Sequence, residues 1–390
     1  MAAIPFSEAL TALLALIGLV WVRRVFWMSA FRRGNPPLEA HPAPSPAPKI
    51  SVIVPARDEE KNIAHCLAHL FKQNYPNYEI LVVDDRSLDG TPAILAALKH
   101  NAPVPLRTVR IEKLPSGWTG KNYAMFTASR AAQGDWLLFT DADTTHAPGS
   151  VSTAAACALE RNIDFLTLAP ETECKSFWEN VVQPLAVSSL ALWFRTASIN
   201  DPARKDTLAN GQFILVKKEA YEKVGGNESV KNEVVEDVEL AKRMKAQGLR
   251  VAFLNGTRIY STRMYSTLKQ IHTGWTRIFT YLFQKNIWAI LHKVLLFLVF
   301  SISPFVLLMT EIILKFNNSE FFSSLVLWSA SGVSAFIIFV RFLGNRLAHT
   351  NPWFAFMHPL GSLVMVWILL SCVTRVIFRQ PSTWRGDKHF

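Results

Sequence analysis

Acidic residues gather at points of this sequence where an apolar segment meets a turn. Residues 137–149, LLFTDADTTHAPG, form an apolar run that stops at Asp141 and Asp143, two carboxylates one residue apart. At a strand end that enters a turn, both carboxylates can converge on a hard cation such as Mg²⁺ or Mn²⁺. Aspartate also begins turns without any ligand, so this pattern alone leaves both interpretations open.

Two further acidic pairs lie elsewhere in the chain. The apolar run ILVVDD ends at Asp84 and Asp85. Two acidic strand ends in one sheet repel each other, so we expect a cation or a donor-rich ligand between them. Glu236 and Asp237 open a helical pattern, where acids suit the helix dipole. An acid there that points at the sheet edge could also act as a general base.

The segments around these acids predict which strands and helices hold the acidic residues in position. Apolar runs ISVIVP, EILVVDD, WLLFTDAD and DFLTLAP alternate with helical patterns at residues 59–71, 91–100 and 121–133. This alternation predicts an α/β domain with a mostly parallel sheet covered on both faces. Ligands bind at the carboxyl ends of strands in such sheets. A dinucleotide dehydrogenase is disfavoured because no G-x-G-x-x-G follows the first strand.

Four apolar segments are long enough to span a bilayer. They cover residues 4–22, 294–314, 321–340 and 355–374. The first could be a cleaved signal peptide, but basic residues follow it and no small-residue cleavage site stands out after it. We therefore expect a retained anchor with its N-terminus outside. The net charge of +11 reflects Lys and Arg beside these segments, which indicates an anionic membrane surface and no nucleic acid.

The sequence predicts a division into six parts. They are an anchor with a basic flank (1–34), a stiff Pro-rich linker (35–49), the α/β domain (50–265), an interfacial amphipathic segment (266–293), three transmembrane segments (294–374) and a basic tail (375–390). The apolar run at residues 181–194 is too short to span, so it is a core helix or one that touches the membrane.

The basic tail conflicts with this topology. Three spans after a cytoplasmic domain place residues 375–390 outside, against the positive-inside rule. We favour a re-entrant segment, with Pro304 and the pair His358 and Pro359 as the candidate breaks. The alternative is a tail that lies outside and has no catalytic role.

Five ordered motifs resemble the family 2 inverting glycosyltransferases, which have the GT-A fold. They are VPARDEEKNI, VVDDRSLDGT, GKNYA, FTDADTTHAPG and VEDVELAKRMKAQG, all within residues 49–265. The phrase LPSGWTGKNYA is similar to the membrane-bound enzymes associated with hopanoid and carotenoid glycolipids. The resemblance implies a Rossmann-like, mostly parallel sheet of the nucleotide-diphospho-sugar transferase type, with transmembrane helices at both ends of the chain.

The resemblance also implies roles for individual residues. Donor-binding roles fall on Pro55, Arg57 and Glu59 at the base and ribose, Asp84 or Asp85 at the base, Lys121 near the donor, and Asp141 at the sugar nucleotide. Asp141 and Asp143 would hold a divalent metal, Mg²⁺ or Mn²⁺, that neutralises the diphosphate leaving group. Asp237 would take the proton of an acceptor hydroxyl that attacks from the opposite face, which gives inversion.

Two segments qualify the resemblance. Processive members carry Arg-Trp after the base helix, whereas QIHTGW, residues 270–275, has no Arg before its Trp. This favours a single transfer, although an interfacial Trp-Arg anchor is an alternative role for the region. The tail STWRGDKHF resembles the ending of some membrane-bound relatives. Further diphosphate or acceptor contacts are therefore expected among Glu236, His272, Trp275, Arg277, Trp384 and Arg385.

The sequence thus predicts a multi-pass enzyme of the inner, cytoplasmic membrane. It would move one sugar from a nucleotide donor, UDP-linked, to a hydroxyl or carboxyl of a lipid such as a hopanoid, carotenoid, polyprenyl or other glycolipid precursor. One alternative is a processive polysaccharide synthase, for which three C-terminal segments are few. The other is a non-catalytic membrane scaffold that keeps the fold, against which the intact acids argue.

Overall fold

The computed structural model describes residues 6–194, 196–380, 382–384 and 387–389. The chain divides into two compact units. The helical unit comprises Met1–Gly34, Cys174–Leu192 and Tyr265–Gln380, and the sheet unit comprises Asn35–Glu173, Trp193–Met264 and Pro381–Phe390. This division differs from the sequence expectation, because residues 174–192 belong with the apolar helices and residues 381–390 of the tail belong with the α/β domain.

The sheet unit is built on a seven-stranded sheet in the order β3-β2-β1-β4-β8-β6-β9. The strands are β1 Ile50–Ala56, β2 Tyr78–Asp85, β3 Leu106–Ile111, β4 Trp136–Thr140, β6 Phe165–Ala169, β8 Phe213–Lys217 and β9 Val251–Asn255. Only β8 is antiparallel to its neighbours, β4 and β6. The predicted mostly parallel sheet is therefore confirmed, and its central strands are buried on both faces as their unbroken apolar runs require.

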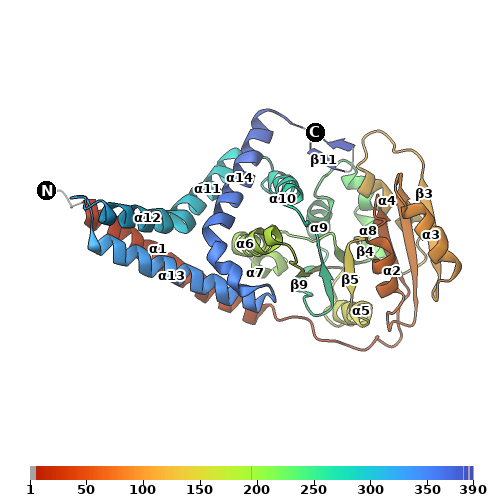
Figure 1. Cartoon of the computed structure of the whole chain (residues 1–390). Helices are drawn as coiled ribbons and strands as arrows, with labels where there is room; N and C mark the ends of the chain where they lie inside the picture. The colour runs from red at the N-terminus through yellow and green to blue at the C-terminus, as the bar shows by residue number, and fades with distance from the viewer. Residues whose placement is uncertain (1–5, 195, 381, 385–386, 390) are drawn as a thin grey trace. The chain divides into compact units, whose positions relative to one another are not determined.

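Helices cover both faces of this sheet (Figure 1). They are α2 Ile63–Leu70, α3 Thr91–His100, α4 Gly120–Ala131, α5 Ser150–Glu160, α7 Thr196–Asn200, α8 Lys218–Lys223 and α9 Glu236–Ala246, with the 3₁₀ turn η1 Gly226–Val230. Successive residues of β1 alternate between two cores: Val52 and Val54 pack with α2 and α5, whereas Ile53 packs with α4 and α9. This alternation is the period of two that a strand imposes.

Smaller elements complete the sheet unit. A second sheet has the order β5-β10-β7, with β5 Thr144–His146, β7 Glu171–Thr172 and β10 Tyr260–Thr262. The Pro-rich segment 35–49 has no helix, as predicted, but it packs on the unit: Leu38 is buried, and its N–H donates to the Asn255 carbonyl. The tail forms the hairpin β11 Ser382–Trp384 and β12 Asp387–His389.

The helical unit contains four stretches that are long and apolar enough to cross a membrane: Phe6–Gly34, Ile287–Phe316, Ser324–Leu347 and Pro352–Ile377. Its elements are α1 Phe6–Gly34, α6 Phe177–Trp193, α10 Leu268–Leu282, α11 Ile287–Phe297, the π-helical turn η2 Leu298–Ile302, α12 Ser303–Phe316, α13 Ser324–Leu347, η3 Pro352–Met357 and α14 His358–Ile377. Residues 287–293 thus belong to an apolar helix, and only α10 remains of the predicted interfacial segment.

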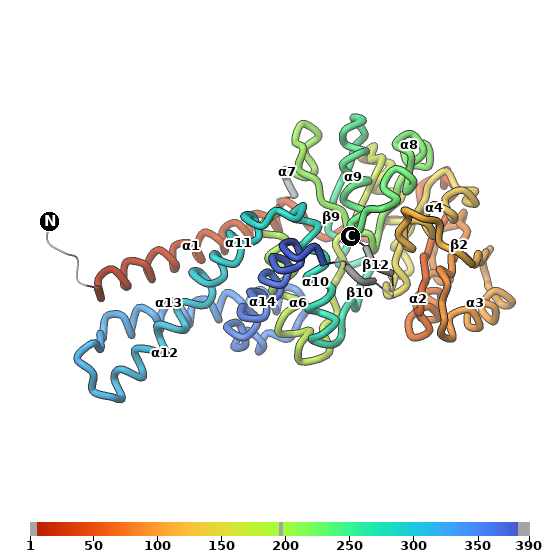
Figure 2. Tube along the Cα trace, turned by 90° about the horizontal axis from the view of Figure 1, so that it is seen from above, coloured from red at the N-terminus to blue at the C-terminus, as the bar shows by residue number. Residues whose placement is uncertain are grey.

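Within this unit α1 and α13 are parallel. Leu14 of α1 packs with Val326 and Ala330 near the start of α13, and near the other end the Arg32 guanidinium donates to the Leu347 carbonyl at 3.4 Å. Both views show these two helices side by side, with α14 running across them (Figures 1 and 2).

The two predicted chain breaks have different outcomes. The chain stays helical from α11 through η2 into α12, so Pro304 does not reverse it and that part of the re-entrant prediction is wrong. Pro304 has no N–H to donate to the preceding helical turn. The π-helical turn η2, in which the backbone hydrogen-bond pattern is wider, lies just before this proline. His358 and Pro359 instead begin α14, where proline suits the first helical turn.

Candidate functional site

The predicted site residues of the sheet unit lie where β1, β2 and β4 end, next to the first turn of α4. Thr119 caps α4 by accepting a hydrogen bond from the Asn122 N–H. Gly120 then packs against the end of β2, where a Cβ would come within 2.1 Å of Asp85 Oδ2. Only glycine lets the helix start approach this carboxylate so closely.

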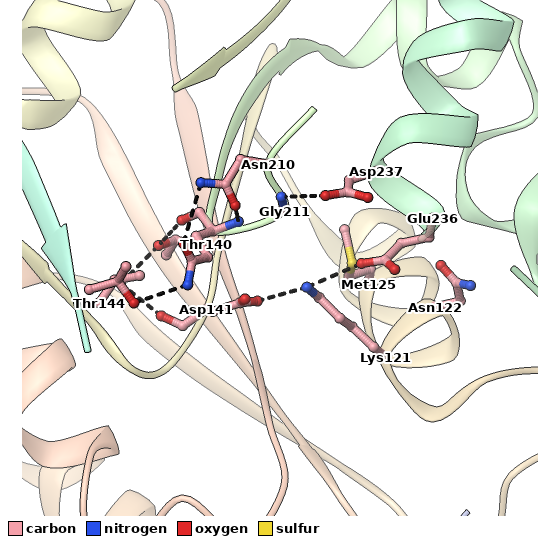
Figure 3. A network of polar contacts seen from close by, with 12 residues as sticks. Lys121, Asn122, Met125, Thr140, Asp141, Thr144, Asn210, Gly211, Glu236 and Asp237 are labelled. Carbon is pink, nitrogen blue, oxygen red and sulfur yellow. Dashed lines mark hydrogen bonds and ion pairs between the residues drawn. The ribbon is translucent and has the colours of Figure 1, made fainter. Parts of the chain in front are cut away.

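Lys121 joins two acidic segments that are far apart in the sequence (Figure 3). Its Nζ lies 2.9 Å from Asp141 Oδ1, at the end of β4, and 3.1 Å from Glu236 Oε1, in the first turn of α9. Burial alone would lower the pKa of Lys121, but the carboxylates of Asp141, Glu236 and Asp237 raise it above its usual value. The lysine is therefore a permanent cation between the two acidic segments.

Asp143 differs from Asp141 in having an unsatisfied oxygen. Its Oδ1 is buried and has no hydrogen-bond partner among the described residues. Burial and the neighbouring carboxylates of Asp141 and Glu59 raise the pKa of Asp143 to about 8. A buried carboxylate oxygen without a donor is the kind of atom that a hard cation satisfies.

The donor set around Asp143 fits a metal that shares its ligands with a substrate. Within the ranges that the structure describes, no group of three His, Cys, Asp or Glu residues is placed to hold a metal ion. Asp141 and Asp143 would supply two carboxylates. Mg²⁺ and Mn²⁺ commonly take their other oxygens from water and phosphate.

The acidic pair of α9 is held in two different ways. Glu236 is engaged by Lys121, whereas Asp237 accepts from the Gly211 N–H at 2.7 Å and from the Val238 N–H at 2.8 Å. Burial and the charge of Glu236 raise the pKa of Asp237 to about 7. A fixed carboxyl group that titrates near neutral pH suits general base catalysis.

Gly211 is a site residue that the sequence analysis missed. It lies in the turn before β8, and a Cβ there would meet Lys121 Nζ at 3.0 Å and Asp237 Oδ2 at 3.3 Å. The neighbouring Asn210 and Gln212 lie in the same turn. A glycine in a polar turn before the apolar run FILVK is the sequence signal that could have directed attention to this position.

The acids at the end of β2 are neutralised by the protein itself. Asp84 Oδ2 lies 2.8 Å from Arg110 Nη1 of β3. Asp85 lies 2.8 Å from Arg86 Nε and 3.6 Å from Arg57 Nη1. Arginine side chains thus supply cations at this strand end, and a ligand between the two acidic strand ends stays a prediction. Arg110 was missed because β3, LRTVRI, alternates with polar residues and was not recognised as a strand.

The other residues predicted at the donor flank this charged cluster. Pro55 lies in β1, and Glu59 lies in the segment between β1 and α2. The Glu59 N–H donates to Thr91 Oγ1 at 2.8 Å, and its carboxylate accepts from the Asn62 side chain at 2.7 Å. These contacts fix Glu59 near Asp143, whose pKa it helps to raise.

A buried polar network supports the loop that carries Asp141. Thr144 Oγ1 donates to the Asp141 carbonyl at 2.7 Å, and Thr140 Oγ1 donates to the Gln212 carbonyl at 2.9 Å. His146 Nε2 lies 2.9 Å from Thr140 Oγ1, and burial lowers the pKa of His146 to about 3. The imidazole is therefore neutral and serves to position the loop.

The predicted contacts in residues 270–277 lie in the helical unit. Trp275 is 2% exposed, and its indole N–H donates to Gln183 Oε1 at 2.8 Å. Trp275 is thus packed within the helical unit, and its predicted diphosphate or acceptor contact stays a prediction. His272 lies 2.9 Å from Ser371 Oγ and stacks on Trp367. Its predicted role and that of Arg277 stay predictions.

The tail residues cannot be placed in the same way. Trp384 belongs to β11, but its side chain lies outside what the structure describes, and so does the whole of Arg385.

Comparison with known proteins agrees with this fold. Residues 51–225 match the family model described as Glycosyl transferase family 2. Two Staphylococcus aureus proteins named 4,4'-diaponeurosporenoate glycosyltransferase are similar over 231 residues, at 26% identity for strain MRSA252 and 27% for strain USA300. Each match covers 58% of this chain and 60% of the relative, so the chain spans about three fifths of the length of these curated relatives.

A solved structure shares the fold over nearly the whole chain. It is the mannosyltransferase PcManGT from Pyrobaculum calidifontis in complex with GDP-Man and Mn²⁺, with a TM-score of 0.53 and 19% identity, and the likeness covers 96% of this chain and 98% of that one. The sheet unit therefore has the GT-A fold, and its residues 51–225 match the model of the family 2 glycosyltransferases. In sequence it resembles the diaponeurosporenoate, that is carotenoid, glycosyltransferases.

Proposed function

We propose that the protein transfers one sugar, with inversion, from a nucleotide-sugar donor to a lipid at a membrane surface. The observation that carries this proposal is the position of Lys121, whose ammonium group contacts both Asp141 and Glu236. It brings the carboxylates suited to a metal close to Asp237, a carboxyl group with a pKa near neutral. A metal site next to a base suits sugar transfer from a diphosphate, because one neutralises the leaving group and the other takes the proton of the acceptor.

In the proposed mechanism, Asp141 and Asp143 hold the divalent metal. Mg²⁺ or Mn²⁺ supplies charge neutralisation for the diphosphate leaving group when it is bound. Asp237 takes the proton of the acceptor group, and the N–H groups of Gly211 and Val238 fix the orientation of its carboxylate. Direct displacement from the face opposite the leaving group inverts the anomeric carbon.

Several residues would bind the donor while the transfer takes place. Pro55, Arg57 and Glu59 are assigned to the base and ribose, and Asp84 or Asp85 to the base. The ion pairs of Asp85 with Arg57 and Arg86 hold that carboxylate in place before any ligand arrives. We propose a UDP-linked donor from the resemblance in sequence. GDP-linked donors belong in the same test because the fold neighbour was solved with GDP-Man.

A lipid acceptor is supported by the apolar helices and by the relatives named for diaponeurosporenoate. We propose that α1, α11 with α12, and α13 cross the bilayer, and that α14 lies along its cytoplasmic surface. The parallel course of α1 and α13 supports this topology, and so does the grouping of the tail with the sheet unit. The basic flank of α1 then places the sheet unit in the cytoplasm, at the inner membrane.

The test uses the full chain in lipid nanodiscs with Mn²⁺. UDP- and GDP-linked labelled sugars are supplied with a bacterial lipid extract, and the products are identified by mass and anomeric configuration. A lipid carrying one sugar of inverted configuration is the expected product. A ladder of oligosaccharides would indicate the processive alternative. Donor binding without transfer or hydrolysis for any donor would indicate the scaffold.

A further inference from the structure

The helical unit buries an arginine without an acidic partner. Arg341 of α13 is 8% exposed, its Nη1 lies 3.3 Å from Ser188 Oγ of α6, and its Nε is buried without a hydrogen-bond partner. Arg24 of α1 places its guanidinium 4.8 Å from the centroid of the Trp21 ring. In the part of the chain that the structure describes, no carboxylate forms an ion pair with either arginine.

The two arginines lie at one level of the helix pair. Trp21 and Ile337 share one hydrophobic cluster, which fixes the register of the parallel helices α1 and α13. Arg24 follows Trp21 by three residues and Arg341 follows Ile337 by four, so each lies about one helical turn further along. Both therefore lie towards the C-terminal ends of their helices, beyond the most apolar part.

His358 completes the cluster from the start of α14. It is 2% exposed, its ring contacts the edge of Trp21 at a centroid distance of 5.6 Å, and its Nδ1 is buried without a hydrogen-bond partner. Both Arg24 and Arg341 act on it electrostatically. Arg24 and His358 thus contact Trp21, and Arg341 acts on His358 from the third helix. We call Arg24, Arg341 and His358 the basic cluster.

Unpaired guanidinium groups among apolar helices are costly to bury, so such residues usually mark a site for a partner. The aromatic face of Trp21 compensates Arg24 only in part. At the cytoplasmic ends of α1 and α13, the groups of a bilayer that carry negative charge are lipid phosphates. We propose that the basic cluster binds the phosphate of an anionic membrane lipid in the cytoplasmic leaflet.

The chemistry of the cluster selects for such a head group. Guanidinium N–H groups, a hydroxyl and an imidazole nitrogen match an acceptor with several oxygens. Phosphatidylcholine carries a cation beside its phosphate, which the two arginines repel, whereas phosphatidylglycerol does not. Exposed apolar side chains on the same helices, Val22 and Leu343, offer contacts to acyl chains that free phosphate lacks. The site does not depend on the transfer reaction, only on the helical unit lying in a bilayer.

The test measures which lipids stay bound to the full chain. Protein in nanodiscs of phosphatidylcholine mixed equally with phosphatidylglycerol is released, and retained lipid is counted by native mass spectrometry. We expect a preference of about tenfold for phosphatidylglycerol, the size of effect that one or two basic residues give at a membrane surface. Equal retention of the two lipids by the wild type would overturn the proposal, and this readout needs neither donor nor turnover.

Substitutions of single arginines test which residues cause the preference for phosphatidylglycerol. Arg341→Gln and Arg24→Gln should each reduce it several-fold. Arg346→Gln, which removes the same charge from an exposed position of α13, should leave it unchanged. If Arg341→Gln does not fold, comparing the lipid preference of Arg24→Gln with that of Arg346→Gln still tests the site. Equal losses in all three variants would indicate general surface charge and overturn the site. Inorganic phosphate added in detergent should not raise the unfolding temperature as phosphatidylglycerol does, and an equal effect would mean that the site takes free phosphate.

Discussion

At the end of β2 three arginines accompany Asp84 and Asp85, whereas at the end of β4 Lys121 pairs with Asp141 and leaves Asp143 Oδ1 without a hydrogen-bond partner among the described residues. The two strand ends look alike in sequence, since each is an apolar run that stops at two acids. One is saturated by the protein's own cations and the other is not. An acidic strand end therefore indicates a metal only when the surrounding elements supply too few cations.

The largest effect on transfer is expected from the acid on α9, Asp237, which differs in role from the acids at the two strand ends. Asp237→Asn keeps the shape of the side chain and removes the base, so kcat should fall by about 10²- to 10⁴-fold while donor affinity stays unchanged. Transfer rates and donor binding by calorimetry are the measurements. Glu239→Gln is the matched control, because Glu239 lies on the same helix and pairs with Lys242. Normal transfer by Asp237→Asn would contradict the assignment of the base.

The next effect tests the unsaturated strand end directly. Asp143→Asn should weaken Mn²⁺-dependent donor binding by about 100-fold, because it removes the carboxylate whose oxygen lacks a partner. The variant should unfold at the same or a higher temperature, since burial already disfavours the charged carboxylate. Donor affinity that does not change with Mn²⁺ in the wild type would refute the metal role of this strand end.

The pH dependence should follow from Asp237. Its pKa is raised to about 7, so the carboxyl group is protonated and inactive as a base below that pH. The value of kcat/KM should rise about tenfold per pH unit on the acidic side and level off above about pH 7. Initial rates with saturating Mn²⁺ across this range would show it. A profile that is flat through pH 7, or that falls as pH rises from acid, would count against Asp237.

The smallest effect is expected at the saturated strand end. Asp84→Asn loses a charged hydrogen bond to Arg110, which is partly exposed, so stability should fall by only about 1 kcal/mol. Urea unfolding measures the loss, with Arg110→Gln as the reciprocal variant. Donor affinity should stay within a few-fold of wild type. A loss as large as that of Asp143→Asn would erase the difference between the two strand ends.

The sequence predicted the strands that end in acid because their apolar runs are continuous and their polar ends are abrupt. It missed β3, since LRTVRI is only partly buried and mixes charged with apolar residues. Arg110 and the saturation of Asp84 were missed with it. Gly211 escaped for a different reason: its contact with Asp237 joins turns 26 residues apart, and local patterns carry no signal of such a contact.

The helical unit was predicted less completely. Apolar length identified four segments that could cross a membrane, because length is the physical requirement. Length does not distinguish a helix that crosses from one that lies across its neighbours, as α14 does relative to α1 and α13. Apolar length also did not show whether the run at residues 181–194 packs in the α/β domain or with the apolar helices. That run forms most of α6 and belongs to the helical unit, where Gln183 accepts the Trp275 indole hydrogen bond.

The pairing of α1 with α13 has a consequence for biosynthesis. Nearly all of the sheet unit is synthesised between these two helices, so α1 is made long before its partner α13. The partner face of α1, with Leu14, Ile17 and Trp21, is covered only when α13 arrives. A protease that removed α1 as a leader would leave Ile337 and Ala330 without their packing partners. In the folded chain the last stage of packing in the helical unit therefore depends on the first segment made.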